Sequence, residues 1–337
     1  MRKKIEKILI FVVTAMVVAA VHFYTVFYTP VSNDMTPKIV NVAQGASFGV
    51  VADNLVTLGV LKSTDGFVLA ASLKNAKKKI KAGEYELTSS MTPVQVLDIL
   101  VEGRVKRYFV TIPEGYNIKE IAATIENAGL VKKEELLKLA FDKNFVRSLG
   151  FEGLEGYLFP DTYQFAKNAG AEEIIKKMTG RFNQVYDSEF KAKSVSLGIG
   201  MKELITLASI IEKESGNASE MPRVAAVFRN RLKKRMPLQS DPTVIYGIKN
   251  FDGNLTRAHL KQPTPYNTYV KFGLPPTPIA NPGKAAIEAA LNPSNENSLY
   301  FVSKNDGTHY FSSTLTEHNS AVEIYQKSLI KKTQREM

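Results

Sequence analysis

The chain has 337 residues, with 44 Lys and Arg against 33 Asp and Glu, so its formal net charge at pH 7 is +11. This length is enough for an anchor and two or three compact domains, and the 44% apolar and 23% charged content is typical of folded proteins. No cysteine is present, which excludes disulfides, thiolate nucleophiles, iron–sulfur clusters and cysteine-ligated zinc. The four histidines form no metal-binding pair on one helical face, so we expect neither a metal nor a cofactor.

Residues 8–29 form an apolar segment that is long enough to cross a membrane. They carry no formal charge apart from any on His22, and as a helix these 22 residues would extend about 33 Å. The alternative is a cleaved signal peptide, but the segment is longer than the usual apolar core of about 7–15 residues, and no Ala-x-Ala cleavage site follows it. We therefore predict a transmembrane helix over residues 8–29.

The charges that flank this segment predict its orientation. Four basic residues precede it, namely Arg2, Lys3, Lys4 and Lys7. The first basic residue after it is Lys38, so the positive-inside rule makes residues 1–7 a cytoplasmic tail. The expected location is the cell inner (cytoplasmic) membrane, crossed once, with all later residues on the exterior or periplasmic side.

Part of the excess positive charge lies in a lysine-rich segment, residues 74–81. A surface that binds nucleic acid would interleave such lysines with aromatic residues for base stacking, and this segment contains none. We therefore expect no nucleic-acid partner, and outside a cell the counter-charge would be anionic lipid or wall polymer. A solvated basic face without a ligand is the alternative.

A segment of 20 residues occurs twice, at residues 42–61 and 112–131, with a constant offset of 70. Two glycine pairs fall at this offset: Gly45 with Gly115, and Gly59 with Gly129. An extended segment, a glycine turn, an amphipathic helix and a glycine stop therefore recur. The unit resembles the LysM-like modules that bind amino-sugar glycans, and we assign residues 38–132 to a LysM-like repeated αβ region. A packing module without a ligand is the alternative.

Beyond Lys132 the sequence becomes mainly helical. Apolar residues at spacings of three and four predict helices within 132–150, 171–190 and 201–216, and a further helix follows Ser219. Residues 237–283 have almost no periodicity but many Pro, Gly, Asn, Thr and Tyr, and a long irregular stretch inside a compact domain usually lines a site. Strand-like segments around Asn305-Asp306-Gly307 predict a hairpin. The expected fold class is α+β.

The helix over 201–216 carries a candidate general acid. Its apolar stripe runs through Leu204, Leu207, Ala208 and Ile211, and continues to Glu214 and Ser215. Glu212 points about 160° away from this stripe on a helical wheel. A carboxyl group on the inward face is costly to ionise, so its pKa should rise, as a general acid requires at neutral pH. The alternative is a helix-terminal Glu that rotates to solvent or pairs with a nearby Arg.

Five motifs resemble, in the same order, those of the YceG-like (MltG) family of endolytic murein transglycosylases. They are EGYLFPDTY (155–163), LASIIEKESG (207–216), LQSDPTVIYG (238–247), PTPYNTYVKFGLPPTPIANPG (263–283) and AALNP (289–293). The resemblance covers nearly the whole chain and implies a single N-terminal transmembrane helix, a LysM-like submodule and a mainly helical lytic-transglycosylase-like catalytic domain. The catalytic domain would be residues 133–337.

The resemblance implies non-hydrolytic cleavage of peptidoglycan glycan strands between N-acetylmuramic acid and N-acetylglucosamine, which leaves 1,6-anhydro-muramic ends and limits strand elongation. One carboxyl group protonates the glycosidic oxygen, and the resulting carboxylate takes the proton of the muramic C6 hydroxyl as it closes on the anomeric carbon. The family's catalytic Glu corresponds to Glu214, and the doublet with Ser215 is similar to that of other lytic transglycosylases. Glu212 is expected to support the site or lie on the surface.

Other polar residues of these motifs are candidates for substrate binding. Those in the irregular stretch are Gln239, Ser240, Asp241, Tyr266, Asn267 and Tyr269. Glu155 could orient the site or cap a helix, and Tyr246 could belong to the site or to the core. His309 and His318 flank the predicted strand–helix junction, where we expect them on the surface.

Two other classes of protein explain part of the sequence. A non-catalytic membrane-anchored scaffold that binds the cell wall and recruits synthesis enzymes would explain the anchor and the repeat, but not the Glu214 helix or the irregular stretch. A polyanion binder would explain the net charge, and its binding would fall steeply with salt, whereas sugar recognition would not.

Overall fold

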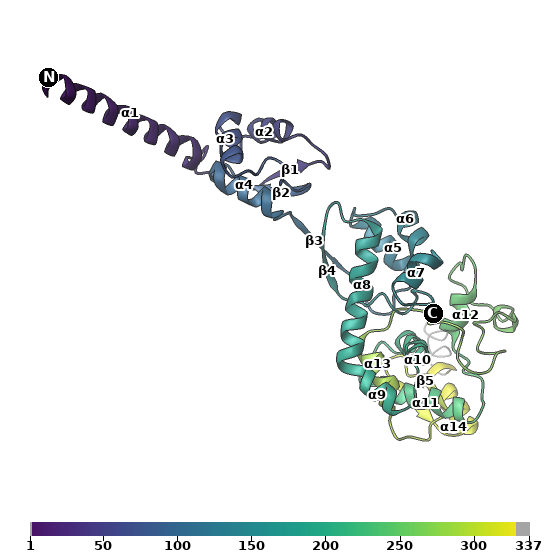
Figure 1. Cartoon of the computed structure of the whole chain (residues 1–337). Helices are drawn as coiled ribbons and strands as arrows, with labels where there is room; N and C mark the ends of the chain where they lie inside the picture. Colours follow the sequence, from purple (N-terminus) through teal and green to yellow (C-terminus); the bar gives the residue numbers. More distant parts are fainter. Residues whose placement is uncertain (1, 328–337) are drawn as a thin grey trace, which may run out of the picture. The chain divides into compact units, whose positions relative to one another are not determined.

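The computed structural model describes residues 2–327, and the chain divides into two compact units (Figure 1). Unit 1 comprises residues 1–109 and 164–169, and unit 2 comprises residues 110–163 and 170–337. Helices predominate, and the described strands form three two-stranded sheets. The predicted mixture of α and β structure with one N-terminal apolar helix is therefore confirmed.

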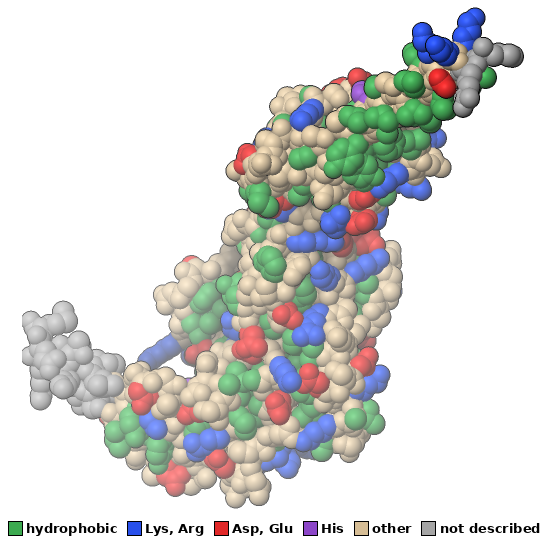
Figure 2. Space-filling view, turned by 90° about the vertical axis from the view of Figure 1, so that its left-hand side faces the viewer, with side chains coloured by type: hydrophobic (Ala, Val, Ile, Leu, Met, Phe, Trp, Pro, Cys, Tyr) green, Lys and Arg blue, Asp and Glu red, His purple; other side chains and the backbone are tan. Residues whose placement is uncertain are grey.

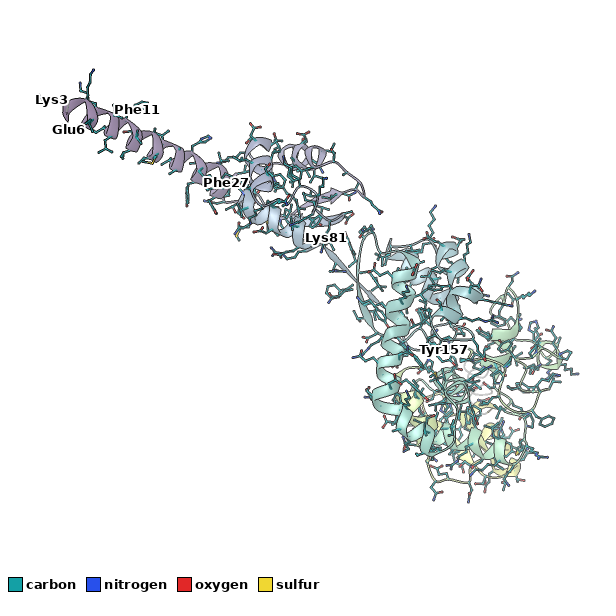
Figure 3. The ribbon with its side chains drawn as sticks, viewed as in Figure 1. Lys3, Glu6, Phe11, Phe27, Lys81 and Tyr157 are labelled. Atoms are coloured by element: carbon teal, nitrogen blue, oxygen red, sulfur yellow. The ribbon has the colours of Figure 1, made fainter. Side chains whose placement is uncertain are left out.

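The predicted membrane-spanning segment is a single helix, α1 (Arg2–Tyr28). It is long and apolar enough to cross a membrane, and side chains such as Phe11 project from it without neighbours (Figure 3). Figure 2 shows basic side chains at its tip and apolar side chains along it. The helix is therefore compatible with a single-pass anchor.

The first αβ module follows α1 in unit 1. Strand β1 (Lys38–Val42) pairs antiparallel with β2 (Gly83–Leu87), and Val40 lies opposite Tyr85. Three helices cover this pair: α2 (Phe48–Thr57), α3 (Thr64–Leu73) and α4 (Pro93–Glu102). The core contains Val40, Tyr85 and Phe67, which are fully buried, and Phe27 from the last turn of α1 joins the same cluster.

The repeated segment has the same local structure in both copies. In the second copy, β3 (Arg107–Thr111) leads into α5 (Ile118–Asn127). β3 corresponds to β1 and α5 to α2, and each lies about 70 residues after its counterpart, as the repeat in the sequence predicts. Gly45 and Gly115 have φ of 78° and 75°, and Gly59 and Gly129 have φ of 65° and 67°. These left-handed values favour glycine, which explains why the glycines recur at these turns. Helices α6 (Lys133–Ala140) and α7 (Lys143–Ser148) then lead to β4 (Thr162–Ala166), which pairs with β3.

The division between the compact units falls before the second copy's helix. Residues 110–163, which include α5, belong to unit 2. The physical reason is the apolar face of α5: its buried Ile118, Ile121 and Ile125 pack toward α6, and α6 packs on α8 (Ala171–Val185). The second copy of the repeat therefore shares its core with the helical region that follows it.

Helix α10 (Met201–Glu214) lies at the centre of unit 2 and positions the candidate site. Leu204, Ala208 and Ile211 on this helix are fully buried, and α10 contacts α11 (Met221–Lys233), α12 (Asp241–Gly247) and α13 (Lys284–Leu291).

The remaining elements are a π-helical turn (Tyr186–Phe190), α9 (Lys191–Ser196), a 3₁₀ turn (His259–Lys261), β5 (Tyr300–Ser303), β6 (His309–Ser312), α14 (Leu315–Val322) and a π-helical turn (Glu323–Lys327).

Residues 237–283 are largely irregular, as predicted, with two exceptions. These are α12 and the 3₁₀ turn, and both are too short to give a periodic pattern. The predicted hairpin is confirmed, because β5 and β6 pair antiparallel around Asn305 and Gly307, which have φ of 65° and 84°.

Candidate active site

The side chain of Glu214 ends helix α10 in a largely buried position. Its Oε1 accepts a hydrogen bond of 2.5 Å from the Ser240 hydroxyl. Burial raises the pKa of Glu214, and Asp241 raises it further, whereas the Ser240 hydrogen bond, His309 and Arg231 oppose this. The net pKa lies above the ordinary value, so the carboxyl group is held toward its protonated form, as a general acid requires.

Glu214 opens into a cavity of about 330 Å³. The residues that line it come from α10, α11, α12, the hairpin, α14 and the irregular stretch: Glu214, Arg231, Leu238, Gln239, Asp241, Tyr269, Tyr300, Phe301, Leu315 and His318. The cavity therefore combines one candidate acid, one guanidinium, a second carboxylate and three aromatic rings, a set suited to polar and stacking contacts with sugars.

The segment that carries Ser240 is held against the following loop. The Gln239 N–H donates to the Thr268 carbonyl over 3.1 Å, and the Ser240 N–H donates to the Thr268 hydroxyl over 3.0 Å. Gln239 has φ of 50°, an uncommon conformation for a residue with a side chain. Ser240 itself is 1% exposed, so its hydroxyl is fixed on Glu214 rather than free in solvent.

Several of the predicted substrate-binding residues meet at this cavity. Gln239, Asp241 and Tyr269 line it, and Ser240 contacts Glu214 at its edge. The Tyr269 hydroxyl donates to Asp241 Oδ1 over 2.7 Å, so these two side chains orient each other. Burial and the neighbouring Asp241 raise the pKa of Tyr269, which keeps its hydroxyl protonated.

Three of the other predicted residues do not line this cavity. The Ser215 hydroxyl donates to the Asn217 carbonyl and accepts from its N–H, which shapes the turn after α10. Asn267 is fully buried, and its amide donates to the backbone carbonyls of residues 259, 260 and 262. Tyr266 hydrogen-bonds Thr277 and packs edge-on against Tyr246 with 4.9 Å between ring centroids. Their contacts organise the loops around the site.

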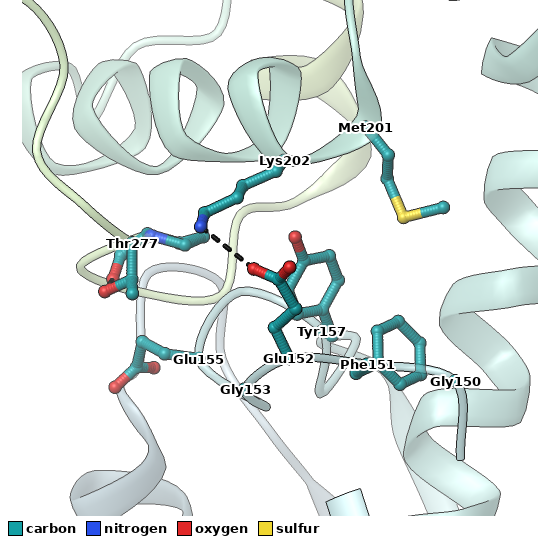
Figure 4. Close-up of a pocket in the computed structure, with 10 residues that line it drawn as sticks. Gly150, Phe151, Glu152, Gly153, Glu155, Tyr157, Met201, Lys202 and Thr277 are labelled. Atoms are coloured by element: carbon teal, nitrogen blue, oxygen red, sulfur yellow. Dashed lines mark hydrogen bonds and ion pairs between the residues drawn. The ribbon is translucent and has the colours of Figure 1, made fainter. Parts of the chain in front are cut away.

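Glu155 lies at a different cavity of about 340 Å³, between the 150–153 loop and the start of α10 (Figure 4). Its carboxyl group accepts hydrogen bonds from the Ile118 N–H (3.1 Å), the Tyr246 hydroxyl (2.9 Å) and the Asn281 amide (3.2 Å). Burial raises its pKa to about 7, although the three hydrogen bonds oppose this. Glu155 therefore joins three segments of unit 2 and is separate from the Glu214 cavity.

Glu212, two residues before Glu214, has different hydrogen-bond partners. Its Oε2 accepts the Gly283 N–H over 2.9 Å, at the N-terminus of α13. Burial raises the pKa of Glu212, and the neighbouring Glu114 adds to the rise. The two glutamates of the helix thus point to different partners, Glu214 to Ser240 and Glu212 to the end of α13.

The prediction that His309 and His318 lie on the surface is wrong. The His309 side chain is 16% exposed, and its Nδ1 lies 2.8 Å from the buried Glu220 carboxylate. His318 stacks on Tyr300 with 5.2 Å between ring centroids and lines the Glu214 cavity, and burial lowers its pKa. The hairpin and α14 bring both residues close to α11, a long-range packing that the local pattern does not indicate.

Arg231 is the main cavity residue that the sequence analysis did not single out. Basic residues at the C-terminal end of a helix such as α11 are accounted for by the helix dipole, so Arg231 does not stand out by its charge. A signal was nevertheless present, because the buried face of α11 runs through Val224, Phe228 and Arg231 at helical spacing. Within residues 2–327, no group of three or more His, Asp or Glu side chains could hold a metal ion.

Comparisons with known proteins identify relatives over most of the chain. The profile of the YceG-like family matches residues 40–324. An endolytic murein transglycosylase of Bacillus subtilis is 36% identical over 321 residues, which cover 89% of this chain and 88% of that protein. One of Streptococcus pneumoniae is 30% identical, over 84% of this chain and 57% of that protein.

A solved structure resembles this fold. The crystal structure of a YceG-like protein from Listeria monocytogenes has a TM-score of 0.60 and 33% sequence identity, and covers 85% of this chain and 98% of that one. Together with the profile match, this establishes the family that the five sequence motifs indicated. The chain belongs to the YceG-like family.

Proposed function

We propose that this protein is an endolytic murein transglycosylase, a lyase that cleaves the bond between N-acetylmuramic acid and N-acetylglucosamine within nascent peptidoglycan strands and leaves 1,6-anhydro-muramic ends. Such cleavage would limit strand elongation. Relatives of this name match most of the chain. The observation that carries the proposal is the carboxyl group of Glu214, which is buried, has a raised pKa and opens into a cavity that can accommodate sugars.

In this reaction Glu214 acts twice. Its proton passes to the glycosidic oxygen as the C1–O bond breaks and positive charge develops on the muramic ring. The resulting carboxylate takes the proton of the muramic C6 hydroxyl, whose oxygen forms the new bond to C1. The Ser240 hydroxyl, at 2.5 Å, holds the carboxyl group in place and stabilises its charged form. No water molecule is consumed, and Glu214 ends protonated.

The other cavity residues fit supporting roles. Asp241 is oriented by Tyr269 and contributes negative charge to the cavity in which the oxocarbenium-like state develops. Gln239 and Tyr269 offer hydrogen bonds, and the rings of Tyr300 and Phe301 offer stacking faces for acetamido sugars. Ser215 shapes the turn that follows Glu214, and Asn267 accepts the Tyr269 N–H, whereas Tyr266 contacts Tyr246 and Thr277 at the Glu155 cavity.

We further propose that residues 1–7 are cytoplasmic, that residues 8–29 cross the inner membrane and that the remainder is exterior. The strand–helix–helix–strand order of β1, α2, α3 and β2 supports a LysM-like identity for the first module. The repeated region over 38–132 would bind glycan, and residues 133–337, of which 328–337 lie outside the described residues, would form the catalytic domain. Peptidoglycan strands are the expected ligand, and cell-wall synthesis enzymes are candidate partners.

Product analysis tests the proposed function. The full chain in detergent micelles is incubated with purified sacculi or nascent glycan, and the ends formed are identified by mass spectrometry. We expect 1,6-anhydro ends with the native chain and none with Glu214→Gln. Reducing ends would instead indicate a hydrolase, and binding without new ends would indicate the non-catalytic wall-binding scaffold.

A further inference from the structure

Arg231 is a buried cation whose hydrogen bonds reach two separate segments beside Glu214. Its side chain leaves α11, and the residue is 7% exposed. Nε donates to the Leu299 carbonyl over 2.7 Å, just before the hairpin, and Nη1 donates to the Leu238 carbonyl over 2.8 Å. The guanidinium also lies 5.2 Å from the centre of the Tyr300 ring. One side chain thus connects a helix, the hairpin and the irregular stretch.

The segment that Arg231 holds is the one that delivers Ser240 to Glu214. Leu238 is buried, and Gln239 adopts its left-handed backbone conformation directly after it. The Gln239 side-chain oxygen is a further acceptor for Nη1, at 3.4 Å. The next residue is Ser240, whose hydroxyl contacts Glu214. The position of the Ser240 hydroxyl therefore depends on a turn that is fixed at its start by the guanidinium.

Arg231 also brings charge to the cavity. It lines the cavity together with Glu214, and no carboxylate of residues 2–327 lies within ion-pair distance of its guanidinium. Its acceptors in that part of the chain are neutral carbonyl groups and an amide, and Nη2 forms no hydrogen bond there. The charge is therefore not cancelled locally and acts on the groups that face the cavity.

Glu214 faces charged and titratable groups from several elements. They are Asp241 on α12, the Tyr269 hydroxyl, His309 on β6 and Arg231 on α11, and His318 on α14 lines the same cavity. Asp241 disfavours the Glu214 carboxylate, whereas Arg231 and His309 favour it. Burial lowers the pKa of Arg231, and Tyr300, Tyr269 and Glu214 oppose this. A guanidinium remains charged at the pH values of the assay, so Arg231 is the constant member of this set.

We propose that Arg231 is a positioning residue for Glu214: it fixes the turn that carries Ser240 and supplies the permanent positive charge that stabilises the carboxylate formed when Glu214 gives up its proton. The inference rests on the proposed function for its catalytic meaning. Its physical part, that the pKa of Glu214 depends on Arg231, can be tested without measuring catalysis.

The first test measures the titration of Glu214 directly. The full chain is labelled with ¹³C at the glutamate carboxyl groups, in detergent micelles, and the Glu214 signal is assigned by its absence in Glu214→Gln. In Arg231→Met we expect the midpoint to move to higher pH, because a nearby cation is lost and the turn that carries Ser240 is released. The control is Arg229→Met on the same helix, whose guanidinium bonds the Ser294 carbonyl and does not line the cavity, and which should leave the midpoint unchanged.

The second test separates charge from geometry through activity. Arg231→Lys keeps the charge but lacks the planar fork that reaches two carbonyl groups, so kcat should fall by about tenfold or more. The alkaline limb of its pH–activity profile, where activity falls as Glu214 loses its proton, should stay at the native pH. Arg231→Met should lower kcat and also move that limb upward. A residue that served folding alone would lower activity equally at every pH and would leave the limb unmoved.

Each of the two roles of Arg231 has a result that would overturn it. A Glu214 midpoint in Arg231→Met that coincides with the native one overturns the electrostatic role, and an undiminished kcat in Arg231→Lys overturns the positioning role. If Arg231→Met does not fold, as judged by its thermal unfolding, Arg231→Gln, which removes the charge but keeps hydrogen-bond donors for the two carbonyl groups, replaces it in the Glu214 titration. If the native chain forms no anhydro ends, the proposed function fails while the carboxyl titration still decides whether Arg231 governs Glu214.

Discussion

Ser240 donates a hydrogen bond of 2.5 Å to Glu214, although the two residues lie 26 positions apart in the sequence. The contact opposes the effect of burial, because a donor to the carboxylate lowers the pKa that desolvation raises. The pKa of Glu214 is thus set by burial and Asp241, which raise it, against the Ser240 hydroxyl, His309 and Arg231, which lower it. This balance gives the first prediction.

Replacement of Ser240 by Ala should move the alkaline limb of kcat/KM to higher pH. The reaction requires protonated Glu214, so activity falls as pH rises through its pKa, and loss of the hydroxyl raises that pKa further. The profile is measured from the rate of anhydro-end formation between pH 5 and 9. Ser219→Ala, which removes an exposed hydroxyl bonded to Asn217, is the control. A limb that moves to lower pH would contradict this account.

Glu214→Gln should retain the fold and glycan binding but lose cleavage by about two orders of magnitude or more, the scale of a general acid. Glu212→Gln should lose far less, because an amide oxygen can still accept the Gly283 N–H. Both variants are compared by product analysis on sacculi, with thermal unfolding to verify the fold. The reverse order of activities would reassign the acid to Glu212.

The native pH profile should itself have its alkaline limb well above the ordinary value of 4.5 for a glutamic acid, because burial raises the pKa of Glu214. The measurement is kcat/KM from pH 4 to 9, with sacculus binding determined at each pH. A profile that is flat from pH 5 to 8, at constant binding, would mean that Glu214 is not the titrating acid.

Glu155 should make the free energy of unfolding depend on pH. Its pKa is about 7 in the folded chain against 4.5 as the ordinary value, so the folded state binds the proton more tightly. This contribution is fully present below pH 4.5 and is lost as pH rises through 7, by an amount of the order of 3 kcal/mol. Glu155→Gln should flatten the dependence in urea unfolding between pH 5 and 8. Glu152→Gln, at an 85% exposed side chain, should leave it unchanged.

Gly156→Ala should destabilise unit 2 by about 2 kcal/mol or more, because its φ of 92° is strained for alanine and a Cβ would lie 2.5 Å from Pro278 Cγ. Gly153→Ala is the matched control three residues earlier, where a Cβ would meet nothing within 4 Å. Thermal unfolding compares the two variants. Equal melting temperatures would show that the 156–158 backbone can shift to accommodate the methyl group.

Local features were predictable from the sequence because they depend on neighbouring residues. The turns at Gly45 and Gly115 follow from the repeat, and the hairpin follows from the turn residues between β5 and β6. The long-range arrangement was not predictable in the same way. The association of α5 with unit 2 depends on which apolar faces meet, and the place of His318 in the cavity depends on how α14 folds back.

The burial of Phe27 has a practical consequence for anyone who wishes to release this protein from the membrane. A fragment that begins at residue 31 removes the whole apolar helix, but it also removes a ring that is 4% exposed within the first module, together with the Val26 side chain that lies over Gly66. Loss of a buried aromatic ring costs about 3–5 kcal/mol. A soluble fragment should therefore begin near residue 24, because Val26 and Phe27, at the outer end of the proposed membrane-spanning segment, pack on the module and must be kept with it.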